Sequence, residues 1–246
     1  MTDTTDLRIA ALKARLDARR PLAPADLARL DAWFDVELTH TSTALEGNTL
    51  TRQETALVLE KGVTVRGKPL KDHLEVVDHR DALTLVRALA SRAEAIREID
   101  LRNIHRLVMA RSAPGHAGIY ANLPRLVAGS RSRFPAAVEL PGLMAGFARW
   151  LANAPADIDT AFEAHLRLVS IHPFADGNGR TARLLMNLLL ARAGYPPVPI
   201  RTEHRPDYLD ALERAQADGD PSPWHGFART RLAEALENYL ALIEGR

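Results

Sequence analysis

Apolar residues recur every three or four positions along most of the chain, which is the spacing of a helix that buries one face. In residues 24–44, for example, Leu27, Leu30, Phe34 and Leu38 follow such steps and predict one helix. Alanine, a strong helix former, is abundant throughout. Further helices are predicted over residues 7–20, 52–61, 70–96, 101–111, 143–151, 160–171, 180–193 and 206–243, the last with a break at 219–221.

Residues 114–141 interrupt this helical pattern. The segment is rich in glycine and proline, and its short apolar pair Leu126-Val127 precedes Gly129-Ser130. We therefore predict an exposed segment with at most a short hairpin centred on Gly129. Since no repeat or low-complexity linker divides the chain, the predicted fold class is all-α, one mostly helical domain with a small N-terminal helical addition.

Composition narrows the function classes. The 246 residues include 32 Lys and Arg against 31 Asp and Glu, a net charge of +1, so direct nucleic-acid binding is not expected. The absence of cysteine excludes disulfides, thiolate zinc sites and cysteine nucleophiles. No apolar run approaches the roughly 20 residues of a membrane span, and the first residues lack the pattern of a secretory signal. A cytoplasmic protein with no membrane partner is the expectation.

The segment that carries candidate chemistry joins two apolar helices within residues 170–190. Pro173 disfavours helical geometry in the residue before it, so the imidazole of His172 is expected at a helix end. The Gly-Asn-Gly turn at 177–179 precedes a helix whose first N–H groups lack internal partners. Because glycines let the backbone approach an anion closely, this turn predicts a phosphate site.

Charged side chains flank the turn. Arg180 and Arg183 are three residues apart on one helix face, and two guanidinium groups beside an anion site favour a polyphosphate. Asp176 offers a hard oxygen ligand for Mg²⁺, and His172 can accept a proton near neutral pH. Each feature also has an ordinary explanation: a plain turn, a helix-end histidine and a solvated arginine face. Taken singly, the residues leave these alternatives open.

Residues 172–183 read His-Pro-Phe-Ala-Asp-Gly-Asn-Gly-Arg-Thr-Ala-Arg. This run resembles the signature of the Fic family, His-Pro-Phe-x-(Asp/Glu)-Gly-Asn-Gly-Arg-x-x-Arg, at every fixed position. The resemblance extends over about residues 24–243 and implies a helical core with a short β-hairpin flap. It also implies the usual reaction of the family, which is the transfer of AMP from ATP to a hydroxyl group of a target protein.

The same resemblance implies roles for single residues. His172 would be the general base for a Ser, Thr or Tyr hydroxyl, and Asp176 would hold Mg²⁺, or Mn²⁺, against the phosphates. Arg180 and Arg183 would neutralise the β- and γ-phosphates of ATP. Tyr208 is either an aromatic residue near the adenine or a half-buried helix tyrosine. The implied nucleotide-binding residues are Gly177, Asn178, Gly179, Arg180, Arg183 and Tyr208.

A second, shorter motif lies between Thr39 and Leu50. Ser42, Glu46 and Gly47 match (Ser/Thr)-x-x-x-Glu-(Gly/Asn), which is similar to the inhibitory motif of many Fic proteins. A helix that simply ends here, with the glycine as its left-handed cap, is compatible with the same residues. The motif alone is therefore weaker evidence than the longer one.

The inhibitory motif implies how the chain is organised and regulated. Residues 1–66 would form N-terminal helices that include the inhibitory helix, and residues 67–246 the catalytic core. The carboxylate of Glu46 would pair with Arg183 at the γ-phosphate position, so that ATP would bind with its α-phosphate misaligned. Similar proteins are commonly dimers, so a homodimer is also expected.

The flap region departs from the family pattern. Tyr120 is followed by Ala121, where relatives commonly have arginine, and the common Pro-Pro pair is Pro135-Ala136 here. A target protein is expected to dock on the flap and present an exposed hydroxyl. The flap is basic, which fits either an acidic target segment or a solvated loop; its basic residues are Arg125, Arg131 and Arg133.

Three functions remain open at the level of sequence. The first is an autoinhibited protein adenylyltransferase. The second keeps the fold but removes AMP or transfers a phosphoryl or phosphocholine group, because fold alone does not fix function. The third is a nucleotide-binding regulator with weak turnover. The intact Gly179-Arg180 pair favours the ordinary orientation of ATP, and the complete motif argues against the regulator.

Overall fold

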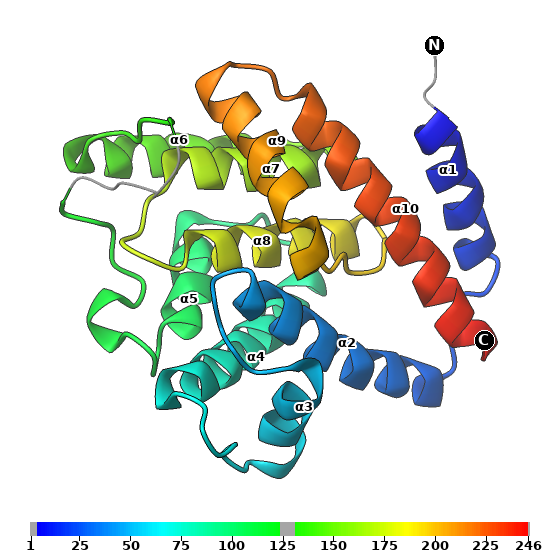
Figure 1. Cartoon of the computed structure of the whole chain (residues 1–246). Helices are drawn as coiled ribbons and strands as arrows, with labels where there is room; N and C mark the ends of the chain where they lie inside the picture. The colour runs from blue at the N-terminus through cyan, green and yellow to red at the C-terminus, as the bar shows by residue number, and fades with distance from the viewer. Residues whose placement is uncertain (1–3, 124–130, 246) are drawn as a thin grey trace.

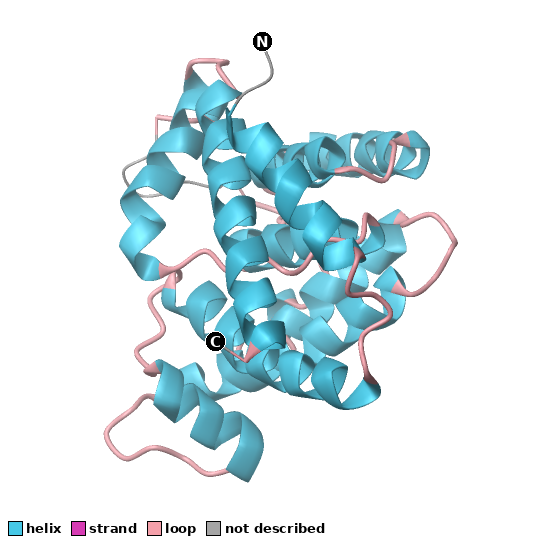
Figure 2. Ribbon diagram, turned by 90° about the vertical axis from the view of Figure 1, so that its right-hand side faces the viewer, coloured by secondary structure: helices cyan, strands magenta, loops and turns pink. Residues whose placement is uncertain are grey.

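The computed structural model describes residues 4–123 and 131–245. Within these ranges the regular structure is helical, apart from one isolated β-bridge, which confirms the predicted all-α class (Figure 2). The α-helices are α1 (Thr4–Asp17), α2 (Pro24–Ala44), α3 (Arg52–Lys61), α4 (Leu70–Ala90), α5 (Glu98–Val108), α6 (Leu140–Asn153), α7 (Ile158–Ile171), α8 (Asn178–Arg192), α9 (Arg205–Ala217) and α10 (Ser222–Glu244). The 3₁₀ turns are η1 (Pro114–His116), η2 (Ala137–Glu139) and η3 (Thr202–His204).

Local sequence signals set several helix ends. At the start of α3, the Thr51 hydroxyl accepts the Glu54 N–H at 3.2 Å and the Glu54 carboxylate accepts the Thr51 N–H at 2.8 Å. This reciprocal pair satisfies two N–H groups that a helix start leaves unpaired. Gly62 then ends α3 in the left-handed conformation, with φ of 64°. Both ends agree with the sequence prediction.

Helix α4 is shorter than predicted, because it ends at Ala90 rather than near Ile96. The Ser91 hydroxyl donates back to the Arg87 carbonyl at 3.1 Å, and Arg192 of α8 donates to two further carbonyls at 2.8 and 2.9 Å. These side chains add to the backbone bonds of the last turn, in which the Arg87 carbonyl also accepts the Ser91 N–H and the Leu89 carbonyl the Arg92 N–H. Ile96 is nevertheless 3% exposed, so apolar spacing continues beyond the end of the helix.

The helical hairpin of α7 and α8 lies at the centre of the molecule (Figure 1). Every residue of α8 from Arg180 to Leu190 is buried. Helices α2, α4 and α5 pack against α8, whereas α6, α9 and α10 pack against α7. The short loop between α7 and α8 is therefore surrounded by elements from distant parts of the chain.

The first and last helices lie side by side, although they come from opposite ends of the sequence (Figure 1). Helix α1 buries Ile9, Leu12 and Leu16. An ion pair of 2.9 Å joins Arg229 of α10 to Asp6 of α1. Across residues 4–123 and 131–245, none of the helices has the length and apolarity needed to span a bilayer.

Two predictions about organisation are not tested by this fold. The hairpin centred on Gly129 lies outside the described residues. Next to it, Tyr120 forms an isolated antiparallel bridge with Phe174. The division into residues 1–66 and 67–246 stays a prediction, and α2 of the first part packs directly on α4 and α8 of the second.

Candidate active site

His172 ends α7 in a left-handed conformation, with φ of 49° and ψ of 56°. Among the described residues it is the one non-glycine with a positive φ. Such geometry is uncommon outside glycine and gathers at functional sites. The imidazole therefore lies at the helix end, as the proline after it predicted.

The orientation of the His172 ring assigns its two nitrogens. Nδ1 lies 3.3 Å from the Val169 carbonyl, and because a carbonyl can only accept, Nδ1 carries hydrogen and Nε2 is the basic nitrogen. The Phe134 ring packs on the imidazole, with centroids 4.3 Å apart and planes at 37°. Phe134 was missed by the sequence analysis, because a phenylalanine in an irregular segment carries no signal of its partner.

Asn178 closes the loop of residues 172–179, which we call the motif loop. Its side-chain Oδ1 accepts the Phe174 N–H at 2.9 Å and its Nδ2 donates to the Phe174 carbonyl at 2.8 Å. Both ends of this buried amide are thereby used to hold the backbone. Asn178 can offer a phosphate its backbone N–H, but its side chain is a brace of the loop.

His105 of α5 also contacts the motif loop, and the sequence did not predict this role. The Gly118 N–H donates to His105 Nδ1 at 2.9 Å, so Nε2 carries the hydrogen and donates to the Asp176 carbonyl at 2.9 Å. The His105 ring also stacks on Phe174, with centroids 3.6 Å apart. Burial lowers the pKa of His105 to about 4, which keeps the ring neutral and this bonding pattern intact.

The segment before the flap is tied to the motif loop by its backbone. The Ala121 N–H donates to the Pro173 carbonyl at 2.9 Å, and the Tyr120 hydroxyl donates to Glu98 at 2.7 Å. Ala121 is 8% exposed. The residue that departs from the family pattern is thus buried against the loop. Arg131, beyond the flap, pairs with Asp218 at 3.1 Å, so its charge is used within the chain.

The structure shows why glycine occupies two positions of the motif loop. Gly177 has φ of 75°, and an added Cβ would lie 2.9 Å from Met109 Sδ. At Gly179 an added Cβ would lie 2.5 Å from Glu46 Oε1 and 2.9 Å from Arg183 Nη1. The positive φ of Gly177 strains any other residue there, whereas a side chain at Gly179 would displace the ends of Glu46 and Arg183.

Asp176 and Arg180 form a charged pair at the rim of the loop. Arg180 is 1% exposed and donates to Asp176 Oδ1 at 3.1 Å and to Glu75 Oε1 of α4 at 3.4 Å. Burial raises the pKa of Asp176, but the charge of Arg180 and the Gly177 N–H outweigh it and hold that pKa below its usual range. Asp176 is thus a carboxylate at neutral pH. Glu75, a buried partner of Arg180, was not predicted.

Arg183 is the meeting point of the two sequence motifs. It is 4% exposed and donates from Nη2 to Glu46 Oε1 at 2.7 Å. It also donates to Ser42, from Nε to Oγ at 3.0 Å and from Nη2 to the carbonyl at 2.8 Å. Burial lowers the pKa of Arg183, but Glu46 and Tyr208 outweigh it and raise that pKa. The arginines are buried and paired, so the solvated-face alternative is wrong.

The end of α2 and the residues after it, 42–49, are called the α2 terminus below. The helix ends at Ala44, two residues before Glu46, and Gly47 follows with φ of 96°. Arg205 of α9 donates to the Leu45 carbonyl at 3.1 Å. Asn48 Nδ2 donates to the Asp72 carbonyl and to Glu75, both at 3.0 Å. Helices α4, α8 and α9 together hold this segment.

Most of the predicted residues line one pocket of about 520 Å³, but Ser42, Gly47 and Arg180 are not part of its lining. Glu46, His172, Asp176, Arg183 and Tyr208 all line it. Tyr208 itself is 3% exposed, and its hydroxyl contacts Arg183 Nη1 at 3.4 Å. The structure thus places this hydroxyl at the arginine. Residues of α9 that also line the pocket and were not predicted are Leu209, Asp210, Leu212, Glu213 and Gln216.

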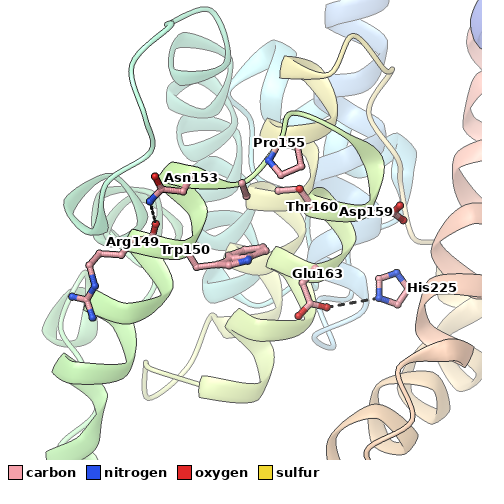
Figure 3. Close-up of a pocket in the computed structure, with 9 residues that line it drawn as sticks. Arg149, Trp150, Asn153, Pro155, Asp159, Thr160, Glu163 and His225 are labelled. Atoms are coloured by element: carbon pink, nitrogen blue, oxygen red, sulfur yellow. Dashed lines mark hydrogen bonds and ion pairs between the residues drawn. The ribbon is translucent and has the colours of Figure 1, made fainter.

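A second hollow of about 620 Å³ lies elsewhere, near the start of α7 (Figure 3). Its wall includes Trp150, Glu163 and His225, with His225 and Glu163 3.7 Å apart. No residue of either motif lines this hollow, which is the more open of the two. Residues of both sequence motifs line the 520 Å³ pocket, so we take that pocket as the candidate active site.

The described residues contain no group of three or more His, Asp or Glu side chains arranged to hold a metal ion. A single carboxylate next to a phosphate site is instead the arrangement that Mg²⁺ prefers, since it keeps waters and binds phosphate oxygens. Asp176 Oδ1 accepts from Gly177 N–H and Arg180, which leaves Oδ2 for such an ion. The donor set therefore fits Mg²⁺ bound together with a polyphosphate.

Comparison with known proteins agrees with this geometry. A sequence model of the Fic/DOC family matches residues 95–190. The chain is 40% identical to the Protein adenylyltransferase Fic of Nematostella vectensis over 205 residues, which cover 81% of this chain and 47% of that protein. A crystal structure of a Fic domain-containing signaling protein from Bacteroides thetaiotaomicron is similar with a TM-score of 0.88, 29% identity and 97% of each chain covered. A fragment of Fic-1 from C. elegans has a TM-score of 0.88 and 27% identity, covering 98% of this chain and 73% of that one.

The match is extensive on one side only. The chain spans about half the length of the curated relatives it matches, 47% of the Nematostella protein and 48% of a relative from Aedes aegypti. Similarity over most of this chain therefore describes one part of those larger proteins.

Proposed function

Because the chain belongs to the Fic/DOC family, we propose that it transfers AMP from ATP to a Ser, Thr or Tyr hydroxyl of a target protein and that Glu46 restrains this activity. The observation that carries the proposal is the convergence of His172, Asp176 and Arg183 on one pocket. The matched relatives bear the name protein adenylyltransferase, which favours AMP over other groups.

His172 is the proposed general base. Nδ1 is held toward the Val169 carbonyl, so Nε2 receives the proton of the target hydroxyl. The hydroxyl oxygen bonds to the α-phosphorus, the bond from that phosphorus to the bridging oxygen breaks, and pyrophosphate leaves. The protein adds little covalent chemistry to such a transfer, so positioning and charge neutralisation dominate.

Phosphate binding falls to the start of α8. The backbone N–H groups of residues 177–179 lie at the start of α8, which is the positive end of its helix dipole. Arg180 and Arg183 supply two positive charges one turn apart. Asp176 would hold Mg²⁺, or Mn²⁺, whose chemistry is to neutralise phosphate charge. Buried arginines in fixed positions neutralise the leaving pyrophosphate without reorganising.

Restraint by Glu46 follows from a competition for Arg183. The carboxylate pairs with Nη2 at 2.7 Å, so a terminal phosphate that needs the same donor must displace it or bind elsewhere. A nucleotide shifted by about 1 Å would lose on the order of a hundredfold in rate. Glu46 has a side chain 34% exposed, so it can leave the pair without opening the core.

Intact-mass analysis of the Glu46→Gly variant tests the proposal. The variant and the wild-type chain are incubated with Mg-ATP and with a cell lysate that supplies targets. We expect an AMP adduct on a side chain, at a level about a hundredfold above that of the wild type. The double variant Glu46→Gly, His172→Ala is the control and should form none.

Other results would favour other functions. A phosphate adduct would assign phosphoryl transfer to the same site, and loss of AMP from a pre-modified target would assign the reverse reaction. No adduct on any protein, with nucleotide binding intact, would make the chain a regulator. Target docking at the flap, with an exposed hydroxyl, remains part of the proposal.

A further inference from the structure

The contacts of Arg183 divide between two helices. The α2 terminus provides Ser42 and Glu46, which together accept three hydrogen bonds from Nε and Nη2. Helix α9 provides Tyr208, whose hydroxyl accepts from Nη1 at 3.4 Å. Ser42 lies within α2, whereas Glu46 lies two residues beyond its end, so an anion can displace Glu46 while Ser42 stays in place. The Tyr208 contact would remain.

Two neighbours contact the Tyr208 hydroxyl. A guanidinium has no acceptor, so the tyrosine oxygen must accept from Arg183. His165 Nε2 of α7 lies 3.0 Å from that oxygen, and in the tautomer with hydrogen on Nδ1 it can receive the hydroxyl hydrogen. In that tautomer the hydrogen bonds run from Arg183 through Tyr208 to His165, and the buried Nδ1 of this neutral imidazole has no partner.

The surrounding side chains hold this arrangement rigidly. His165 is fully buried and stacks on Trp224, with ring centroids 4.3 Å apart. Trp224 is anchored by its Nε1, which donates to the Phe162 carbonyl at 2.9 Å. Tyr208 meets Trp224 edge-on at 5.9 Å. Burial of His165, together with the charge of Arg183, keeps the pKa of its imidazole well below the ordinary value, consistent with the neutral form.

We propose that Tyr208, oriented by His165, is a positioning residue that keeps Arg183 aimed at the pocket when Glu46 is replaced by an anionic ligand. The inference rests on the proposed function, in which that ligand is the terminal phosphate of ATP. A buried arginine that has lost the carboxylate of Glu46 keeps its bonds to Ser42 and Tyr208, and of these two partners Tyr208 is the one that contacts Nη1. This role differs from a contact between the Tyr208 ring and the adenine.

Two nucleotides separate these roles. Isothermal titration of the Glu46→Gly protein with Mg-ATP and with AMP gives two dissociation constants. For Glu46→Gly, Tyr208→Phe we expect the constant for Mg-ATP to rise roughly tenfold, the size of a hydrogen bond to a charged group, and the constant for AMP to stay unchanged. AMP lacks the γ-phosphate, so a role of Tyr208 in positioning Arg183 leaves the dissociation constant for AMP unchanged. An equal loss for both nucleotides would assign the ring to the base, and no loss for either would also overturn the proposal.

Matched variants control for packing. Tyr239→Phe removes the hydroxyl of another buried tyrosine, on α10 and distant from Arg183, and should leave both constants unchanged. His165→Phe keeps an aromatic ring but removes the acceptor, so it should act in the same direction as Tyr208→Phe and more weakly. In transfer assays, the effect of Tyr208→Phe should appear in the KM for ATP rather than in kcat.

A measurement without nucleotide keeps this inference separate from the proposed function. In Glu46→Gly protein labelled with ¹⁵N-arginine, hindered rotation of the Arg183 guanidinium gives separate Nη signals, identified by their loss in Arg183→Lys. We expect Tyr208→Phe to merge these signals. Signals that stay separate would overturn the positioning role, even if the chain bound no ATP at all. Failure of Mg-ATP to bind the Glu46→Gly parent would instead refute the proposed function.

Discussion

The motif loop and the α2 terminus both lie beside α8, yet they differ in their bonds: distant residues such as His105 and Ala121 also contact the motif loop, but its own side chains close it. The motif loop is closed by bonds between near neighbours, such as the Asn178 amide on the Phe174 backbone and the Thr181 hydroxyl on the Gly177 carbonyl. The α2 terminus is held by residues far away in sequence. Its carbonyl at Leu45 is bound by Arg205 and its Glu46 carboxylate by Arg183.

This difference separates what must stay fixed from what can move. The bonds that close the motif loop join residues four apart, from Phe174 to Asn178 and from Gly177 to Thr181. The bonds of the α2 terminus depend on side chains of other helices, and an anion at Arg183 competes with Glu46 for the same N–H donor. A ligand could therefore displace one region and leave the other intact.

The largest expected effect comes from removing the imidazole of the motif loop. His172→Ala in the Glu46→Gly background should lower AMP transfer by about a hundredfold to ten-thousandfold, the range of general base catalysis. Transfer of labelled AMP and the thermal unfolding midpoint are measured together. The midpoint should change little, since the ring is only partly buried at the helix end. Undiminished labelling would remove His172 from the mechanism.

A pair of asparagines on α8 tests whether the Asn178 side chain holds the shape of the motif loop. Asn178→Ala removes the side chain that binds the Phe174 backbone. Asn187→Ala is the matched change, because Asn187 Oδ1 accepts the Val198 N–H at 2.7 Å and Asn187 Nδ2 donates to the Val198 carbonyl at 3.3 Å. Each change should cost about 1–3 kcal/mol of unfolding free energy.

The two variants should differ in activity. Asn178→Ala should also lower AMP transfer in the Glu46→Gly background by tenfold or more, because the loop that carries His172 loses its shape. Asn187→Ala should keep the transfer rate of its folded fraction. Chemical unfolding gives the stabilities and labelled-ATP transfer gives the rates. If both variants lost transfer equally, the local role of Asn178 would be refuted.

A smaller effect is expected from pH at the α2 side. His79 of α4 contacts Thr39 of α2, with Nδ1 and Oγ1 3.1 Å apart, and burial next to Arg183 and Arg180 lowers the pKa of His79 to about 3. In the unfolded chain this imidazole becomes protonated near its ordinary pKa of about 6.5, whereas in the folded chain it stays neutral. Its contribution to the unfolding free energy is therefore fully present above about pH 6.5. That contribution is lost progressively as pH falls toward about 3.

The His79→Gln variant isolates this contribution. Between pH 7.5 and 5.5 the wild type should lose about 1.4 kcal/mol more unfolding free energy than the variant, because one pH unit below the unfolded pKa is worth that amount. Urea unfolding at both pH values measures the difference. Equal losses in the two proteins would show that His79 is not held neutral in the folded chain.

Much of the architecture could be read from the sequence because its signals are local. The helical stripe of residues 24–44, the Thr51 cap and the stop at Gly62 all depend on neighbours within one or two turns. The end of α4 could not be read, since it depends on Arg192 from α8. The motif loop could also be predicted, because its signals, a proline, a glycine turn and the start of the next helix, lie within twelve residues.

The sequence by itself determined most of the helices, the position of His172 at a helix end and the chemical types of group around the proposed phosphate site. Only the tertiary structure decided what each of those groups touches. It placed His105 under the loop, Glu75 on Arg180 and the Tyr208–His165 pair behind Arg183. Such contacts join helices that meet only when the core closes, and a buried charge finds its partner by burial and distance, which leave no periodic trace along the chain.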